Sequence, residues 1–367
     1  MRFLFSAFSC LFSLVVYSQT NLDTIYGNPK SVREKVEFLS EKKQNYVFMS
    51  GDGDYGHATI FTPKGIKSRF HLYWYNYHWV FYVNYYKEFL ENGKAKNETW
   101  YNKDGSFERE YKYTYDEKNN LTEKKEIYYD GEYNLTKYSY DYRDRIMSCI
   151  SSYSNMTDLY SYALFKYDSL GRLVKTSRYR DEGYSGSIFR KYNKFDSIVR
   201  EFRHSPKKWV ENEDGSRTYK SDSVGSWQDI YRCKYNENKN LVLKASYRDG
   251  SDKISSRTIY KYDERNNVIY EGYARDTVYA YRKYKYDLKN RKIYYEYSVI
   301  NNDFTKKLVE YRYNERGYIV NVLCFFQKKE YNIDYKYKFD EKGNWIKIIK
   351  VVNNEPLYVW SRKIKYY

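Results

Sequence analysis

The chain has 367 residues and a formal net charge of +17; 51 residues are Tyr and only 4 are Pro. A mean hydropathy of -0.94 with 31% charged residues would suit an unfolded chain, but 21% aromatic residues argue against disorder, because aromatic rings supply apolar surface for a core. Tyrosine favours β-strands, since its ring packs on a pleated surface while its hydroxyl stays in water. The composition therefore excludes a disordered chain and predicts a folded, strand-rich protein.

The start of the chain, positions 1–18, has the layout of a secretory signal peptide. Arg2 is the only charge ahead of an apolar run, Phe3 to Val16, and Val16 and Ser18 supply the small residues that precede a signal-peptidase cleavage site. The run is shorter than the roughly 20 residues that a membrane-spanning helix needs, and no later stretch approaches that length. We therefore expect export to the periplasm, the cell surface or the medium, with no transmembrane span in the mature chain.

Cysteine and histidine use gives no sign of a disulfide framework or a metal centre. Cys10 lies within the predicted signal peptide, where a lipoprotein signal is the alternative to the cleaved secretory signal; the bulky Phe8 nearby and the continuing apolar run disfavour it. The mature chain keeps an odd number of cysteines without CxxC spacing, and its histidines do not cluster with them at ligand spacing. We expect no metal and no cofactor. The cysteines of the mature chain are Cys149, Cys233 and Cys324, and its histidines are His57, His71, His78 and His204.

A repeat runs through most of the chain. Each copy has an aromatic residue, then Asp or Asn, then three residues later Gly, Asn or Asp, and then an apolar pair; YDSLGRLV is the clearest copy. The copies begin at Tyr115, Tyr140, Tyr167, Tyr192, Tyr235, Tyr262, Tyr286, Tyr313 and Phe339. Their spacing is nearly constant, except for one longer step from Tyr192 to Tyr235. The chain therefore has a period of about 26 residues with one insertion.

The repeated residues are those of a β-hairpin turn. The Asp or Asn side chain accepts a hydrogen bond from the N–H two residues on, and the residue three positions later tolerates a left-handed backbone in every copy but one, where it is Lys239. A type I turn with a G1 bulge follows, and it places each aromatic opposite the residue five after the Asp or Asn. That partner is apolar except at Lys292, so this copy is expected to carry one extra residue, because Ile293 comes next.

A second set of turn signals, such as Asp130-Gly131 and Asn353-Asn354, lies between these turns, so each unit consists of two strands. The sequence predicts an all-β fold in which antiparallel β-hairpin repeats form a curled meander sheet, a partial spiral or shell. The expected divisions are a signal peptide over 1–18, an entry region with degenerate repeats over 19–89, and repeats over 90–367 with an inserted hairpin near 203–228.

The strings YDSLGRLVKTSRY, YKYDERNNVIYEGY and YKFDEKGNWIKI resemble the YD repeat of the RHS-repeat family, over roughly residues 85–367. The resemblance implies a β-hairpin sheet that curls into a spiral or partial shell. Only the copy at Tyr167 has the full GRL of the motif. Because Tyr367 falls only about one repeat period after Asp340, we expect a short exported form without the conserved core and toxin domain of large RHS toxins, and that toxin activity is not carried over.

One candidate binding surface is a stripe of cations. The residue before the motif aromatic is Lys or Arg in seven copies: Lys166, Lys191, Lys234, Lys261, Lys285, Arg312 and Lys338. Strand alternation places these residues on the face opposite the motif aromatics. With the net charge, such a stripe could attract a polyanion. The alternative, which we favour, is a solvated sheet face whose lysine stems cover apolar neighbours.

A second candidate is FHLYWYNYHWVFYVNYY, residues 70–86, in which Tyr73, Trp74, Tyr77 and Trp79 are the first choices for stacking on sugars or bases. The alternative is a pair of strands buried on both faces. The string GDGDYG, residues 51–56, has two acids at calcium-loop spacing but no third oxygen ligand and no closing acid, so it is expected to be a turn.

We find no motif for catalysis: GxSxG, HExxH and phosphate-cradling loops are absent from the sequence, and the recurrent acids belong to turns. The sequence therefore predicts an exported, noncatalytic β-repeat protein of the cell envelope that binds a glycan or a protein partner or acts structurally. Two alternatives stay open. One is a basic polyanion or nucleic-acid binder, although nucleic acid is the less expected partner; the other is an accessory or remnant of an RHS-type toxin system.

Overall fold

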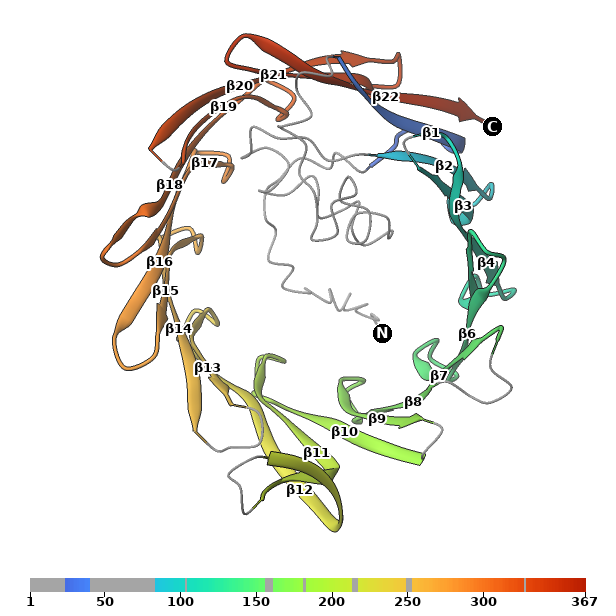
Figure 1. The fold of residues 1–367 in the computed structure, drawn as a ribbon, viewed down its shortest axis with the longest axis vertical. Helices are drawn as coiled ribbons and strands as arrows, with labels where there is room; N and C mark the ends of the chain where they lie inside the picture. The colour runs from blue at the N-terminus through green and yellow to red at the C-terminus, as the bar shows by residue number, and fades with distance from the viewer. Residues whose placement is uncertain are drawn as a thin grey trace, which may run out of the picture.

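The computed structural model describes residues 24–39, 83–102, 104–155, 161–180, 183–212, 217–248, 253–326 and 328–367. Within these ranges the chain folds into 22 antiparallel strands that form one sheet. Figure 1 shows that the sheet closes on itself as a ring. The described residues contain no helix, and so none that could cross a membrane. The predicted signal peptide lies outside the described residues.

The strand bounds follow the two-strand repeat. They are β1 Pro29–Phe38, β2 Asn84–Phe89, β3 Ala95–Tyr101, β4 Phe107–Tyr115, β5 Leu121–Tyr128, β6 Tyr133–Tyr140, β7 Ile146–Tyr153, β8 Ser161–Tyr167, β9 Leu173–Arg180, β10 Gly183–Tyr192, β11 Ile198–Glu211, β12 Arg217–Tyr235, β13 Leu241–Tyr247, β14 Ile254–Tyr262, β15 Val268–Ala274, β16 Val278–Tyr286, β17 Lys292–Val299, β18 Asn302–Tyr313, β19 Ile319–Phe326, β20 Lys329–Phe339, β21 Trp345–Val352 and β22 Glu355–Tyr366.

The ring is closed by β1, which pairs antiparallel with β2 on one side and with the last strand, β22, on the other. Every other strand pairs with its neighbours in sequence, as a meander requires. The prediction of antiparallel β-hairpins in a meander is therefore confirmed. The predicted open curl is wrong, because pairing between β1 and β22 satisfies both edges that an open sheet would leave unpaired.

The motif turns have the predicted conformation in all nine copies. The residue three positions after the Asp or Asn has a positive φ throughout, from 57° at Asp144 to 84° at Gly317. Lys239, the apparent exception, adopts the same conformation with a φ of 64°. Glycine at Gly171, with a φ of 82°, takes up this backbone without the cost that a Cβ atom adds.

Asp168 shows what the acid of each motif does. Its Oδ1 atom accepts hydrogen bonds from the backbone N–H groups of Leu170 and Arg172, at 3.0 and 2.9 Å, and its Oδ2 atom accepts one from the Arg172 guanidinium at 2.8 Å. Burial acts to raise the pKa of Asp168, but the hydrogen bonds from Arg172 outweigh it, so the pKa lies below its usual value. The acid is therefore a structural part of the turn.

The predicted pairing register is confirmed in all nine copies, from Tyr115 opposite Leu121 to Phe339 opposite Trp345. Tyr286 lies opposite Lys292 in this same register. The expected extra residue in that copy is therefore wrong: Lys292 keeps the place that an apolar residue holds in the other copies, and its side chain is buried.

A further regularity connects one repeat to the next. The hydroxyl of each motif tyrosine donates a hydrogen bond to the backbone carbonyl of the residue that pairs with the preceding motif aromatic; Tyr167, for example, donates to Ile146 at 2.9 Å, and Tyr262 to Leu241 at 2.7 Å. In the last copy, where Phe339 has no hydroxyl, Tyr337 donates to Ile319 at 2.8 Å instead. We call this bond the tyrosine clamp. It explains the choice of Tyr over Phe.

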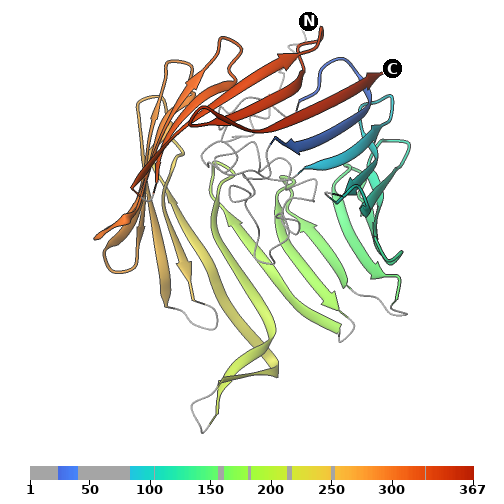
Figure 2. The same cartoon turned by 45° about the horizontal axis from the view of Figure 1, so that its top comes forward.

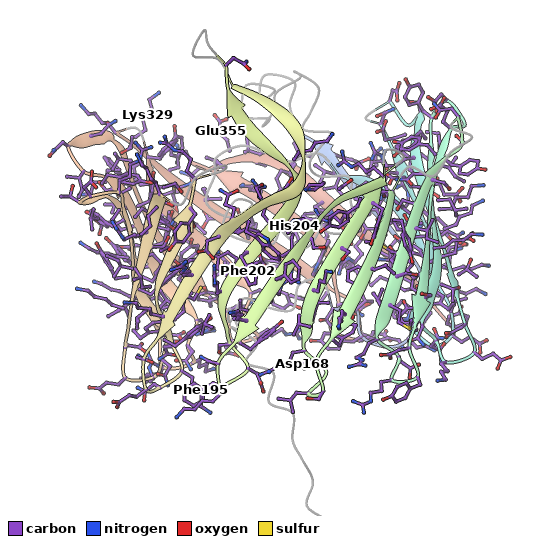
Figure 3. The ribbon with its side chains drawn as sticks, turned by 90° about the horizontal axis from the view of Figure 1, so that it is seen from below. Asp168, Phe195, Phe202, His204, Lys329 and Glu355 are labelled. Carbon is purple, nitrogen blue, oxygen red and sulfur yellow. The ribbon has the colours of Figure 1, made fainter. Side chains whose placement is uncertain are left out.

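The long step in the repeat corresponds to β11 and β12, which have 14 and 19 residues. Figure 2 shows that this pair projects beyond the edge of the ring. The motif turns lie at the opposite edge, where Asp168 and Phe195 are found in Figure 3, whereas Lys329 and Glu355 lie at the edge from which the β11–β12 ribbon projects.

The buried core is concentrated where the ring closes. Its largest fully buried side chains include Trp100, Trp345, Trp360 and Tyr111, on β3, β21, β22 and β4. At the joint itself, the buried Glu34 accepts hydrogen bonds from Arg362 Nε at 2.7 Å and from Trp360 Nε1 at 2.9 Å. The closing strand is thus fixed by both apolar packing and a buried ion pair.

Candidate functional site: an aromatic patch on the outer wall

Side chains on the strands alternate between the outside and the inside of the ring. Phe202 and His204 lie on the outer face of the wall that is turned to the viewer in Figure 3. Lys191 pairs with Arg200, two residues before Phe202, so the residue before each motif aromatic points outward and the motif aromatic points inward. This assignment fixes the two faces of the sheet.

A row of aromatic side chains crosses five adjacent strands on this outer face. Ring centroids are 5.8 Å apart between Tyr162 and Tyr179, 5.5 Å between Tyr179 and Tyr184, 5.9 Å between Tyr184 and His204, and 4.8 Å between His204 and Trp227. The strands that contribute are β8 to β12, in order. Neighbouring strands, about 4.8 Å apart, set the spacing of the rings.

Two phenylalanines extend this row toward the motif turns. Phe189 and Phe202 stack at 5.3 Å with an interplanar angle of 12°, and their rings lie 5.1 and 5.8 Å from Trp227. Trp227 is the most exposed of the group, with 58% of its surface accessible. We call the seven residues the outer patch; they are Tyr162, Tyr179, Tyr184, Phe189, Phe202, His204 and Trp227.

Small residues and hydrogen bonds hold the rings of the outer patch in place. The Tyr184 hydroxyl lies 2.8 Å from the Ser187 hydroxyl and 3.1 Å from His204 Nδ1, and Ser187 in turn contacts Ser177 at 2.8 Å. A Cβ atom at Gly225 would lie 2.4 Å from His204 Nε2, so glycine is required for the imidazole to occupy its position. The patch is therefore pre-organised, because its rings are fixed before any ligand arrives.

Cationic side chains border the outer patch on the side of the motif turns. Lys191, Arg200 and Arg232 are opposite one another on β10, β11 and β12. Arg200 and Arg232 both bind the buried carboxylate of Asp229. Burial acts to raise the pKa of Asp229, but the hydrogen bonds from the two arginines outweigh it and hold the pKa below its usual range. This carboxylate thus stays charged and fixes the two guanidinium groups.

Three cationic side chains lie over rings of the outer patch, and one of them is Lys191, whose ammonium is 5.9 Å from the Phe202 centroid. The Lys175 ammonium lies 5.2 Å from the Phe189 centroid, and the Arg200 guanidinium lies 4.7 Å from the Phe202 centroid. Such distances are typical of cation–π contacts. The chemistry of the surface is therefore a set of half-exposed ring faces with positive charge along one side.

The structure places the predicted cation stripe as follows. All seven residues, Lys166, Lys191, Lys234, Lys261, Lys285, Arg312 and Lys338, are exposed on the outer face. Lys191, Lys261 and Lys285 lie over aromatic rings of the adjoining strand, 5.0 to 5.9 Å from the ring centroids. Only Lys191 borders the outer patch directly. The other predicted residues, Tyr73, Trp74, Tyr77 and Trp79, and the GDGDYG string lie outside the described residues.

Strand alternation would have been enough to find part of the outer patch. Phe189 is two residues before Lys191, so its outward face follows from strand alternation. Tyr184 is seven residues before Lys191 and reaches the same face only because the pairing of β9 and β10 shifts between Tyr184 and Gly186. His204 faces outward because of a further shift beside the motif turn. Trp227 is different, because it belongs to the inserted β11–β12 pair, whose pairing contains two bulges and has no counterpart in the repeat. The position of Trp227 beside Phe202 could therefore not be inferred from the sequence and is known only from the structure.

The inner face holds a second set of titratable groups. Lys292, Lys307 and Lys350 are buried, and burial lowers the pKa of Lys292 and of Lys307 to about 8 and that of Lys350 well below its usual value. Among the described residues, no group of three or more His, Cys, Asp or Glu side chains is arranged to hold a metal ion. The recurrent acids are spread along the turns of the ring.

Comparison with known proteins assigns no family and no function to the chain. No protein-family model and no curated protein matches the chain. Solved structures that match include a Tc holotoxin pore of Photorhabdus luminescens, at 10% identity and a TM-score of 0.33 over 76% of this chain and 19% of that one. A TcdB2–TccC3–Cdc42 structure matches at 9% identity and a TM-score of 0.25, over 73% and 22%.

A porin-like protein from Bacteroides uniformis matches at 8% identity and a TM-score of 0.24, over 92% of this chain and 98% of that one. The chain spans about a fifth of the length of the Tc toxin chains. At these TM-scores the matches carry no argument, so the fold rests on the strand pairing and the relation to RHS repeats stays a prediction.

Proposed function

We propose that the protein is an exported, noncatalytic carbohydrate-binding protein of the cell envelope, and that the outer patch is its binding surface. The observation that carries the proposal is the continuous row of aromatic rings across β8 to β12, with Trp227 exposed at its end. Aromatic faces bind the apolar C–H faces of sugar rings and add little entropy cost, because their side chains have few rotatable bonds.

The layout of the wall supports a chain-like ligand. The rings lie on successive strands of a sheet surface, so they offer contacts along a line across the strands, whereas a small molecule is usually enclosed by a concave pocket. The predicted signal peptide supports a ligand outside the cytoplasm. The acids of the motif support a noncatalytic role, since the turns use both carboxylate oxygens of Asp168 for hydrogen bonds.

The proposal is tested with the mature full-length chain on an array of neutral and acidic polysaccharides. We expect binding to at least one polysaccharide, and a loss of about tenfold or more in affinity for Trp227→Ala, since a large aromatic side chain that a ligand covers contributes on the order of 1.5 kcal/mol or more to an interface. Tyr279→Ala is the matched control, because Tyr279 is 44% exposed on β16, away from the outer patch. Absence of binding to every polysaccharide would overturn the proposal.

A further inference from the structure

A row of cationic side chains runs beside the outer patch. The row formed by Lys191, Arg200 and Arg232 is offset from the phenylalanine row by two residues along the strands, or about 7 Å. Lys175 borders the same rings from β9. A ligand that lies on the rings would therefore have positive charge running alongside it, over three to four strands.

The single carboxylate among these side chains does not cancel that charge. Asp229 is shared by Arg200 and Arg232, and its own side chain is 4% exposed. Lys191 and Lys175 add two further positive charges beside the rings. The border of the patch is therefore net positive, and buried Asp229 holds the two arginines in place more than it screens them.

The geometry points to an acidic polysaccharide as the ligand of the outer patch, with sugar rings stacked on the aromatic row and their carboxylate or sulfate groups held by the cations beside it. This inference rests on the proposed function and names the ligand class. A neutral polysaccharide would make no charged contact with the cationic row. A guanidinium held by a neighbouring carboxylate presents its other N–H groups in a fixed direction, which suits recognition of planar anionic groups.

A single-stranded nucleic acid also combines rings with negative charge. The acidic polysaccharide is favoured because the predicted signal peptide takes the protein out of the cytoplasm, where most nucleic acid is found. The two ligands differ in a way that can be measured, since only the polysaccharide carries its charges directly on the rings that stack.

The test is a calorimetric titration of the full-length mature protein with alginate, dextran and an oligothymidylate as acidic, neutral and nucleic-acid probes. We expect alginate to bind at least about tenfold more tightly than dextran, as one or two charge-assisted contacts would give. We also expect the alginate affinity to fall between about 50 and about 300 mM salt, because exposed charges are screened over that range.

Substitutions of the lysines measure the contribution of the charges to binding separately from that of the aromatic rings. Lys175→Gln combined with Lys191→Gln should weaken alginate binding about tenfold or more and leave dextran unchanged. These two lysines are chosen because neither holds Asp229, so the ion pairs that fix the wall stay intact. The control is Lys283→Gln with Lys347→Gln, two exposed lysines on β16 and β21 whose removal should change nothing.

Three results would overturn the inference. Equal affinity for dextran and alginate, insensitive to salt, would show a neutral ligand and leave the proposed function standing. Tighter binding of the oligothymidylate, lost in the same lysine variants, would assign the patch to nucleic acid. Binding of neither polysaccharide, with the fold verified by circular dichroism, would overturn the proposed function as well.

Discussion

The two halves of the ring are built from the same repeat but are stabilised differently. In the half that contains the closure, β16 to β22 and β1 to β4, the inner face holds fully buried tryptophans and tyrosines. In the other half, β5 to β15, inner side chains are mostly half-buried, and the aromatic residues that gather at the outer patch lie on the outside. Stability is therefore concentrated in one half, and the proposed binding surface lies in the other.

This difference suggests a division of roles. Hairpin turns and tyrosine clamps occur in both halves and specify the path of the chain, whereas a packed core is added only where the ring closes. A wall that depends on local turns can change its outer residues without losing its fold. We expect substitutions in the outer patch to affect binding far more than stability.

The largest effect is expected at the closing strand. Glu34→Gln should lower the free energy of unfolding by about 3–5 kcal/mol, because it leaves the buried guanidinium of Arg362 without its carboxylate. Glu37→Gln, in the exposed pair between Glu37 and Lys35 on the same strand, should cost no more than about 1 kcal/mol. Denaturant unfolding measures both. Equal costs would mean that the buried pair does not hold the ring closed.

A matched pair of isoleucines compares the two halves directly. Ile319 and Ile198 occupy the same position after the motif turn, opposite Tyr313 and Tyr192, but Ile319 is 2% exposed and Ile198 is half-buried. Ile319→Ala should cost about 2–5 kcal/mol, and Ile198→Ala clearly less, because less apolar area is lost and solvent fills the space. If the Ile198 variant were the less stable of the two by urea unfolding, the proposed difference between the halves would be wrong.

The buried lysines of the closure half should make the stability of the protein depend on pH. The folded pKa values of Lys292 and Lys307, about 8, lie below the ordinary value of 10.5, so between these limits the unfolded chain binds more protons than the folded one. Burial of these ammonium groups should therefore make stability rise as the pH increases from about 8 to about 10, whereas buried Cys and Tyr side chains, whose pKa values burial raises, act in the opposite direction. The lysine contribution is measured as a difference: over this range the unfolding free energy of the unaltered protein should increase relative to that of Lys292→Met. A difference that does not change with pH would contradict the burial of the Lys292 ammonium group.

The tyrosine clamp should contribute equally in both halves. Tyr262→Phe and Tyr313→Phe each remove a hydrogen bond to a backbone carbonyl, of 2.7 Å to Leu241 and of 2.6 Å to Lys292, and each should cost about 1 kcal/mol. Thermal unfolding of the two variants provides the comparison. If only Tyr313→Phe lowered the stability, the clamp would contribute only where it packs on the buried core. The clamps would then not stabilise both halves alike.

The repeat made much of the fold predictable from the sequence. Turn chemistry at positions such as Asp168 and Gly171 determined the hairpins, and the pairing of Tyr167 with Leu173 followed from the turn, because a G1 bulge fixes the register. The left-handed backbone at Lys239 was not predictable from residue type, since the fixed register of the hairpin outweighs the preference of one side chain.

Closure and the outer patch were not predictable, for a common reason. Both depend on contacts between segments that the repeat does not relate: Glu34 on β1 and its partner Arg362 lie near opposite ends of the chain, and Trp227 reaches His204 through an insertion with irregular pairing. Charge patterning did separate the two faces of the sheet, and the structure shows that the cations before the motif aromatics are all exposed. Local periodicity thus gave the strands and faces, and long-range pairing gave the ring and the patch.

The central claim is that the outer patch binds carbohydrate without supporting the fold. The most direct test measures alginate affinity and the unfolding midpoint together for the unaltered protein and Trp227→Ala. We predict an affinity loss of about tenfold or more with a change in unfolding free energy below about 1 kcal/mol, because the indole is 58% exposed. Unchanged affinity in a folded Trp227→Ala protein would contradict the account.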